Sequence, residues 1–259
     1  MHPGKGGLGH NVHGQHLVHA MYGCPMNQPQ TGLTAAGSQS RRERYREETF
    51  AEIRSHALAQ VMEGGESAVS LNAIARQMGM SPSALYRYYD SRESLVVELI
   101  ADIYDELSDH LLGSSVGKKL PSERLRALAR GYREWALRNP NKYRLIFETS
   151  ASSAAGLSSE RVVAASQRSM GLFQEVLSEV GVSDSVGIST SLDEQLREWG
   201  RRAHSVELPA TVLVTALTVW TRLHGFASLE IGQHLKATGV DPSLLFEVEL
   251  DRQTAMTVK

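Results

Sequence analysis

Hydrophobic positions along this chain recur mostly at helical spacing. The first clear stripe has apolar residues three or four positions apart, at Phe50, Ile53, Ala57 and Val61. A second stripe is a strict four-residue ladder formed by Leu95, Leu99, Ile103, Leu107 and Leu111. Such periods are typical of amphipathic helices. They predict one helix that ends at Gly64-Gly65 and a second, long helix that ends between Gly113 and Gly117.

The remaining chain also reads as helices joined by short loops. Helical periods predict elements over 121–138, 140–150, 160–180, 190–204, 209–235 and 241–257. Prolines stand near the starts of four of them, at Pro121, Pro140, Pro209 and Pro242, where a first helical turn tolerates proline. Loops are expected over 150–159 and 181–191, and alternating strand patterns are absent. The predicted fold class is therefore all-α.

Residues 1–40 differ in composition from everything that follows. They hold eight Gly, three Pro and five of the ten His, without one acidic residue. No helical or strand period is visible, so we predict a disordered extension, and whether it belongs to the native protein stays open because Met21 and Met26 lie inside it. His10, His13, His16 and His19 recur every third residue, but Gly14 interrupts that stripe, so no metal site is predicted.

The most informative stretch runs from Ser70 to Leu95 and has the spacing of a helix-turn-helix. Ser70 can cap a short helix over 71–78, and Gly79 supplies a left-handed residue to end it. Ser81 and Pro82 then open a second short helix, which Leu85 and Tyr89 can pin to the first. Asp90 is expected to cap the long helix, with Glu93 completing a capping box.

The second short helix carries side chains suited to DNA. Its outward positions are mostly short, so its backbone can approach DNA closely, and a recognition helix reads base edges with its N-terminal residues. Tyr86 and Tyr88 can donate hydroxyl hydrogen bonds to phosphates, and Arg92 can pair with a phosphate. The candidate DNA-binding residues are Ser70, Asn72, Ser81, Pro82, Ser83, Ala84, Tyr86, Arg87, Tyr88 and Arg92.

The stretch from Gly79 to Leu95 resembles the TetR family of bacterial transcriptional regulators, and the resemblance covers about residues 45–100. Tyr88-Tyr89 stands where the family has His-Phe, and Arg92 stands where it has Lys. The resemblance implies that Tyr86, Tyr88 and Arg92 grip phosphates. It also implies that Asn72, Pro82, Ser83 and Ala84 face bases.

The larger C-terminal part resembles the regulatory domain of one TetR branch, which carries a Trp…His-Gly signature. The matching residues are Trp220, His224-Gly225 and a stretch from Tyr132 and Trp135-Ala136 to Pro140 and Tyr143-Arg144. The resemblance implies an effector-binding domain that dimerises through the last two long helices. Part of that surface would come from Leu244, Leu245, Val248 and Ala255. Gly225 inside a helix suggests the close approach of another element.

Aromatic and soft apolar side chains in this part are candidates for a ligand cavity. They are Tyr132, Trp135, Tyr143, Phe147, Met170, Phe173, Trp220 and His224. Any one of them can equally be a core residue, and His224 can be a hydrogen-bonded core histidine instead of a ligand contact.

Charge and composition narrow the function classes. Net charge is -2, residues 41–92 carry a net +1, and one cysteine excludes an internal disulfide. Arg41, Arg42, Arg44 and Arg46 can reach DNA, although interleaved glutamates also fit a solvated helix start. No apolar run of membrane length and no signal peptide is visible, which predicts a cytoplasmic protein that joins the nucleoid when bound to DNA.

These observations predict a three-part chain: a disordered extension over 1–40, a helix-turn-helix domain over 41–90, and a helical ligand-binding and dimerisation domain over 91–259. The expected function is a homodimeric repressor that a small molecule releases from a palindromic operator, with activation as the alternative sense. No cofactor or metal is expected. An enzyme lacks support because no catalytic or nucleotide-binding motif is present. A DNA-binding protein without an effector stays open and would lack a cavity.

Overall fold

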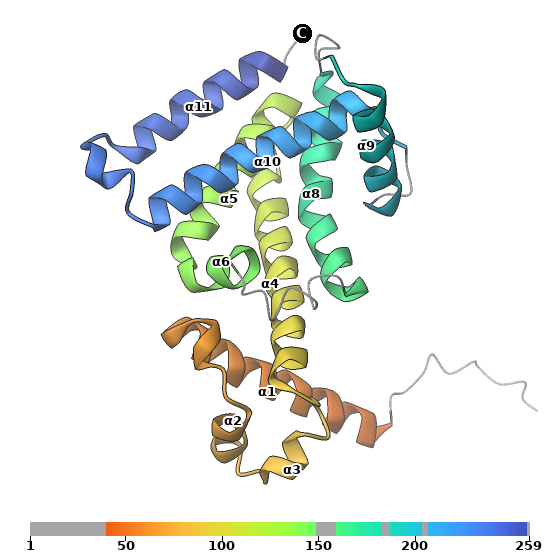
Figure 1. The fold of residues 1–259 in the computed structure, drawn as a ribbon, viewed down its shortest axis with the longest axis vertical. Helices are drawn as coiled ribbons and strands as arrows, with labels where there is room; N and C mark the ends of the chain where they lie inside the picture. The colour runs from red at the N-terminus through yellow and green to blue at the C-terminus, as the bar shows by residue number, and fades with distance from the viewer. Residues whose placement is uncertain (1–39, 149–158, 183–186, 204–206, 258–259) are drawn as a thin grey trace, which may run out of the picture. The chain divides into compact units, whose positions relative to one another are not determined.

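The computed structural model describes residues 40–148, 159–182, 187–203 and 207–257, and every long regular element in them is a helix (Figure 1). Residues 41–259 form one compact unit. The all-α prediction is confirmed for the described residues. The extension expected to be disordered, the histidine stripe within it and most of the loop expected over 150–159 lie outside them.

The compact unit begins with three helices that share a small core. These are α1 (Arg41–Gly64), α2 (Leu71–Gln77) and α3 (Pro82–Leu85), with a 3-10 turn, η1 (Glu66–Ala68), between the first two. The predicted face of α1 is buried at Ile53, Ala57 and Val61, while Phe50 is half-buried. Ile74 of α2 and Leu85 of α3 are fully buried and complete this core.

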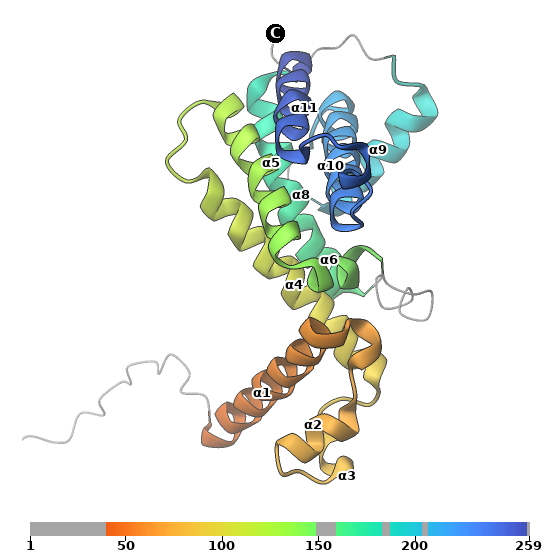
Figure 2. The same ribbon diagram turned by 90° about the vertical axis from the view of Figure 1, so that its left-hand side faces the viewer.

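The long helix α4 (Arg92–Ser115) runs from this small core into the larger helical body (Figure 2). All five residues of its four-residue ladder are at most 2% exposed, which confirms the predicted stripe. The helix packs against α1 near its start and along α5 and α8 further on. Because each four-residue step advances about 40° around the helix, the ladder turns gradually along α4, and this one stripe contributes to a core shared with α1, α5 and α8.

The body consists of α5 (Pro121–Arg138), α6 (Pro140–Phe147), α8 (Glu160–Val180), α9 (Thr190–Ala203), α10 (Ala210–Ile231) and α11 (Pro242–Thr257). The bounds of α5 and α8 are those predicted. Helix α10 ends at Ile231, four residues before the predicted end, because the chain turns at Gly232 and Gln233 has a positive φ of 62°. A 3-10 turn, η3 (Lys236–Thr238), leads into α11.

Helix α10 is more apolar than is usual for a helix with one side exposed to solvent. It is the one helix in the described part of the chain with the length and composition to cross a membrane, and 33% of that apolar window is buried inside the protein. Its inner side packs against α5, α8, α9 and α11. The other side carries the exposed residues Thr218 and Leu229, and the space beside Gly225 is open within the described chain.

Candidate nucleic-acid interface and ligand pocket

Short polar caps set the geometry of the helix-turn-helix. The Ser70 hydroxyl accepts a hydrogen bond from the Ala73 N–H at 3.3 Å, and the Ser81 hydroxyl accepts one from the Ala84 N–H at 3.2 Å. Gly79 adopts a φ of +65°, which confirms the predicted left-handed turn. Each cap satisfies an N–H that has no partner within its own helix, so both short helices begin where the sequence predicted.

The cap of the long helix differs from the prediction. Ser91, not Asp90, holds the cap position, and its hydroxyl accepts from the Ser94 N–H at 3.0 Å. The Ser94 hydroxyl in turn accepts from the Ser91 N–H at 3.2 Å, so the reciprocal box uses two serines and not Asp90 with Glu93. The prediction of Asp90 and Glu93 was wrong because the backbone becomes helical one residue later, at Arg92.

The outer side of α3 presents the predicted base-facing residues to solvent. Ser81, Pro82 and Ser83 are exposed, and Ala84 is half-buried. Tyr86 is 45% exposed, and Arg87 is also exposed, with no hydrogen bond or ion pair from its guanidinium to a described residue. Asn72 is exposed on the neighbouring helix α2. The start of α3 can therefore approach a ligand with little side-chain bulk in the way.

Two aromatic residues after α3 hold it against α1. The ring of Phe50 lies edge-on to Tyr88 and Tyr89, with centroids 5.1 and 5.5 Å apart. Tyr89 is 5% exposed, and its hydroxyl accepts a hydrogen bond from Arg54 at 3.4 Å. Tyr89 is thus the buried aromatic residue that was predicted. The ring of Tyr88 is half-buried, and its contact with a phosphate stays a prediction.

Arg92 is occupied by contacts within the chain. Its Nε donates to the Val69 carbonyl at 3.2 Å, and its Nη2 donates to the Glu66 carbonyl at 2.5 Å. The guanidinium also lies 3.5 Å from a carboxylate oxygen of Glu66. These bonds fasten the η1–α2 connection to the start of α4. We call these contacts of Arg92 with Val69 and Glu66 the Arg92 clamp. If Arg92 also contacts a phosphate, the same guanidinium serves both the clamp and the phosphate.

Replacing Arg92 with alanine is therefore expected to destabilise the fold as well as weaken DNA binding. Two charge-assisted hydrogen bonds and part of an ion pair disappear, so the free energy of unfolding should fall by about 1–3 kcal/mol. Chemical denaturation monitored by circular dichroism measures this change. Arg87→Ala is the matched control, since that guanidinium has no partner in the described chain, and equal stability of the two variants would rule out the clamp.

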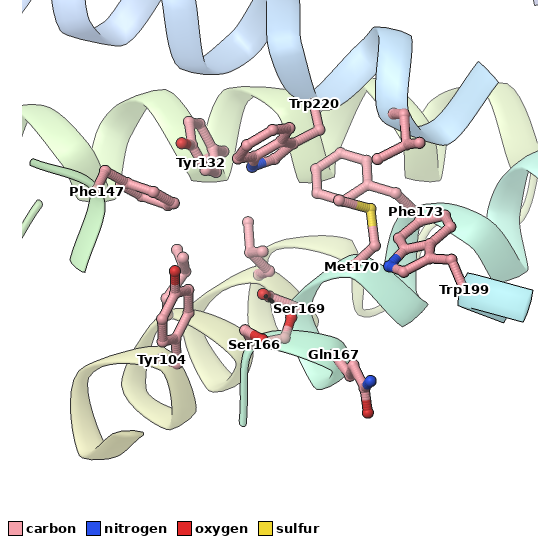
Figure 3. A pocket seen from close by; sticks show the side chains of 13 residues that line it. Tyr104, Tyr132, Phe147, Ser166, Gln167, Ser169, Met170, Phe173, Trp199 and Trp220 are labelled. Atoms are coloured by element: carbon pink, nitrogen blue, oxygen red, sulfur yellow. Dashed lines mark hydrogen bonds between the residues drawn. The ribbon is translucent and has the colours of Figure 1, made fainter. Parts of the chain in front are cut away.

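The helical body has a half-open cavity of about 250 Å³ among α4, α5, α6, α8, α9 and α10 (Figure 3). Five of the eight predicted pocket residues line it: Tyr132, Phe147, Met170, Phe173 and Trp220. The lining residues that the sequence analysis did not assign to a pocket are Tyr104, Leu107, Leu111, Ser166, Gln167, Ser169, Trp199 and Leu217. Tyr104 stands three residues before Leu107 and seven before Leu111 on α4, and this helical spacing is a signal that could have found it.

Trp135, Tyr143 and His224 do not line the cavity. The indole N–H of Trp135 donates to Glu106 at 3.1 Å. The Tyr143 hydroxyl lies 2.9 Å from Nδ1 of His224 and 3.0 Å from its carbonyl oxygen. His224 stacks on Trp220, with ring centroids 5.4 Å apart. Of the two interpretations of His224, the hydrogen-bonded core histidine fits these contacts, because both tyrosine and histidine already have polar partners.

Burial favours the uncharged forms of the polar groups around this cavity. Burial lowers the pKa of His224, against a smaller opposing effect of Glu148, so the imidazole is neutral at pH 7. Burial raises the pKa of Tyr104 to about 12, and its hydroxyl donates to the Ile146 carbonyl at 3.3 Å. Burial, and secondly the neighbouring Tyr143, raise the pKa of Tyr132 well above the ordinary value.

A row of ion pairs connects α1 to α8 across the outer side of α4. Asp102 lies 2.8 Å from Arg54 of α1 and 3.2 Å from Arg161 of α8. Asp105 lies 2.7 Å from Arg161 and 2.6 Å from Arg168. Burial alone would raise the pKa of Asp105, but hydrogen bonds from the two arginines outweigh it and lower that pKa. The row thus connects α1, whose Arg54 bonds Tyr89, with α8, which lines the cavity.

Comparisons with known proteins agree with this two-part arrangement. Residues 53–99 match the family of bacterial regulatory proteins named tetR, and residues 125–253 match the tetracyclin repressor-like C-terminal domain. A transcriptional regulator of the helix-turn-helix type from Mycobacterium bovis, Mb1846, is 27% identical over 219 residues, which span 79% of this chain and 90% of that protein. The regulator BetI of Rhizobium meliloti is 32% identical over 74 residues, spanning 29% of this chain and 36% of its own.

The crystal structure of SCO4313, a candidate regulatory protein, superposes with a TM-score of 0.65 at 35% sequence identity, covering 83% of this chain and 98% of the other. The matched families and the Mycobacterium relative are transcriptional regulators, so the prediction that this protein is not an enzyme is confirmed. Helix-turn-helix, helical body and relatives agree, and the chain belongs to the TetR family of DNA-binding bacterial transcriptional regulators.

Proposed function

We propose that the protein is a homodimeric repressor that leaves a palindromic operator when a small molecule enters the aromatic cavity. The observation that supports this most is the presence, in one compact unit, of an exposed recognition helix and a ring-lined cavity. In this proposal residues 41–90 read DNA, and residues 91–259 bind the effector and the second subunit. A DNA-binding protein without an effector would have had no need of the cavity.

DNA recognition would use the exposed start of α3. Asn72, Pro82, Ser83 and Ala84 would face base edges in the major groove, where short side chains allow close approach. Around them, Ser70, Ser81, Tyr86, Arg87 and Tyr88 would hold phosphates, and Arg92 would add its charge from within the clamp. Two subunits related by twofold symmetry would read two half-sites of a palindrome, and the protein would act in the cytoplasm at the nucleoid.

Dimerisation would cover the exposed sides of α10 and α11. On α11, Leu244 is 69% exposed, and Val248 and Ala255 follow at helical spacing on exposed positions. Leu245 is 39% exposed. On α10, no described atom from another element lies within 4 Å of where a side chain on Gly225 would begin. The close approach that the sequence predicted for Gly225 does not occur within the described chain, so we assign it to the second subunit.

The Trp220…His224-Gly225 signature supports membership in the TetR branch that carries it. Trp220 lines the cavity, His224 stacks behind Trp220, and Gly225 lies on the open side of α10. One helical turn thus contributes to the pocket on one side and to the proposed dimer surface on the other. The three signature residues therefore serve the pocket on one side of α10 and the proposed dimer surface on the other.

Effector binding would reach the recognition helix through α4 and the ion pairs beside it. Ser166, Ser169 and Met170 of α8 line the cavity, and Arg168 between them holds Asp105 and Asp109 of α4. Asp102 continues the row to Arg54, which bonds Tyr89 immediately after α3. A ligand that displaces α8 would therefore move α1 and α4, and DNA would weaken ligand binding by the same factor as ligand weakens DNA binding.

Replacing Asp102 with asparagine is expected to reduce this coupling. The amide keeps the shape but loses the charge that attracts two arginines from different helices. The factor by which effector weakens operator binding should fall about 3- to 10-fold, while each ligand alone still binds. Operator titrations with and without effector measure that factor. Glu194→Gln, an exposed change on α9, is the control, and an unchanged factor in Asp102→Asn would contradict the proposed route.

Footprinting of the purified protein on DNA around its own gene, at two salt concentrations, tests the proposed function itself. A protected palindrome whose protection weakens at higher salt is the expected result. An operator found this way then serves for effector screening. Uniform, sequence-independent protection would contradict the regulator proposal.

A further inference from the structure

The cavity in the helical body is lined without a charged side chain. None of its 13 lining residues is an aspartate, glutamate, lysine, arginine or histidine, and six of them are aromatic (Figure 3). His224 lies behind Trp220, and burial lowers its pKa. Arg161 and Arg168 of α8 are paired with aspartates of α4. A charged group in this lining would lose hydration without gaining an opposite charge, so the lining favours an uncharged group.

Three hydroxyl groups of the lining already donate within the chain. The Ser166 hydroxyl donates to the Val163 carbonyl at 2.9 Å, and the Ser169 hydroxyl donates to the Ser166 carbonyl at 2.9 Å. The Tyr104 hydroxyl donates to the Ile146 carbonyl at 3.3 Å. Each of these groups has a single hydrogen, so none of them has a second one for a ligand.

The indole N–H groups of Trp199 and Trp220 are the donors that remain. Neither has a hydrogen-bond partner in the described part of the chain, and neither nitrogen is among the fully covered polar atoms that lack one there. In Figure 3 the Trp220 nitrogen lies on the ring edge that faces Tyr104 across the cavity. The Tyr132 hydroxyl is covered by protein atoms, and the Gln167 amide points away from the other labelled side chains. The cavity thus offers a ligand two donors, one on α9 and one on α10.

An accessible N–H group is costly to cover without a partner. Water satisfies it until a ligand enters, and a ligand without an acceptor removes that water and returns no hydrogen bond. A carbonyl, ether or ring-nitrogen acceptor restores the bond and needs no charge to do so. The two open donors therefore favour a ligand with an acceptor over one that is purely apolar.

We propose that the cavity binds an uncharged ring compound whose acceptor oxygen or nitrogen pairs with the indole N–H groups of Trp199 and Trp220. This inference rests on the proposed function and names the chemical class of its effector. The volume of about 250 Å³ suits about two fused rings, since a cavity of about 150 Å³ is known to hold benzene. The six aromatic side chains of the lining supply faces and edges against which such rings pack.

Three probes of similar size test the chemistry: 2-acetylnaphthalene has the acceptor, 2-ethylnaphthalene lacks it, and 2-naphthoate carries a charge. Equilibrium dialysis against the full-length protein measures each affinity. We expect the acetyl probe to bind and the naphthoate to bind at least about 10-fold more weakly, because the lining has no cation to replace its hydration. No binding of the acetyl probe, or naphthoate binding as tight as that of the acetyl probe, overturns the proposal.

The ratio of the acetyl-probe affinity to the ethyl-probe affinity isolates the hydrogen bond. In the double variant Trp199→Phe, Trp220→Phe this ratio should fall about 3- to 10-fold, the value of one neutral hydrogen bond. The lost ring volume affects both probes and cancels in the ratio. Tyr104→Phe is the matched control from the same cavity and should keep the ratio, since its hydroxyl already donates to Ile146. A ratio that is unchanged in the double variant overturns the assignment.

Indole N–H signals provide a second test that needs no variant. The chain has three tryptophans, and the N–H of Trp135 already donates to Glu106 at 3.1 Å. In proton–nitrogen correlation spectra of the unaltered protein, at least one indole signal should move further downfield with the acetyl probe than with the ethyl probe. The physical reason is that a hydrogen bond deshields the donated proton. Equal shifts with the two probes overturn the proposal, even if the double variant fails to fold.

The same preparation without any probe is footprinted on DNA, so the two proposals fail separately. Protection of a palindrome with none of the expected probe behaviour overturns the ligand class and leaves the DNA-binding function standing. The expected probe behaviour without sequence-specific protection supports the ligand site and contradicts the operator-bound regulator.

Discussion

Gly225→Leu is expected to convert the dimer into a monomer while leaving each subunit folded. Within one chain the substitution is favourable, because the space beside Gly225 is open and leucine stabilises a helix interior by nearly 1 kcal/mol relative to glycine. Across the proposed interface it adds four carbons where two helices meet, and symmetry introduces the clash twice. Overpacking costs about 1–3 kcal/mol per site, so dimer affinity should fall about 100-fold or more.

Sedimentation velocity at micromolar protein measures the change in association, and thermal unfolding reports the stability of the subunit. Operator affinity should fall with it, because one recognition helix reads a single half-site. Gly113→Leu is the matched control: Gly113 is also helical, in α4, with open space beside it, but it lies outside α10 and α11. A Gly225→Leu protein that sediments as a dimer would place the subunit interface on another surface.

Arg87→Ala is expected to weaken operator binding about 10- to 100-fold without loss of stability. The guanidinium of Arg87 is exposed beside α3 and has no partner in the described chain, so its removal costs the fold nothing. In a dimer two phosphate contacts disappear. Since each neutralised phosphate contributes about 0.9 to the slope of log affinity against log salt, that slope should become shallower by about two.

Binding assays at several salt concentrations, on the operator and on a scrambled sequence, measure both effects. The loss should be similar on the two DNAs, because phosphates carry no sequence information. Arg201→Ala on α9 removes an equal charge, whose partner is Glu198 on the same helix, and serves as the control. An unchanged slope in Arg87→Ala would show that this arginine does not reach a phosphate. A loss confined to the operator would instead indicate that it reads a base.

Local sequence signals determined the helices and the helix-turn-helix. The four-residue ladder of α4, the cap at Ser81 and the left-handed Gly79 are properties of short segments, and each appears as predicted. The error at Asp90 has the same local origin. Aspartate and serine are both good caps, and the choice between adjacent candidates depends on where the backbone first becomes helical, which packing of α4 decides.

Pocket membership could be predicted only in part. Helical periodicity identifies which aromatic residues face inward, but an inward face can meet a cavity, a polar partner or another side chain. Phe147 and Trp220 meet the cavity, whereas Trp135 turns to Glu106 and Tyr143 to His224. Trp199 on α9 joins the lining from a helix whose sequence is mostly polar. Which of these occurs depends on how α5, α8 and α10 pack together.

By itself, the sequence determined an all-helical chain with a DNA-reading motif, because caps, turns and apolar periods act over fewer than ten residues. Only the tertiary structure revealed the Arg92 clamp and the row of ion pairs from Arg54 to Arg168. Each of these depends on groups 20 or more residues apart. The packing of the helices around α4 sets the distances between these groups and therefore their hydrogen bonds and ion pairs. Short stretches of sequence do not predict such distances.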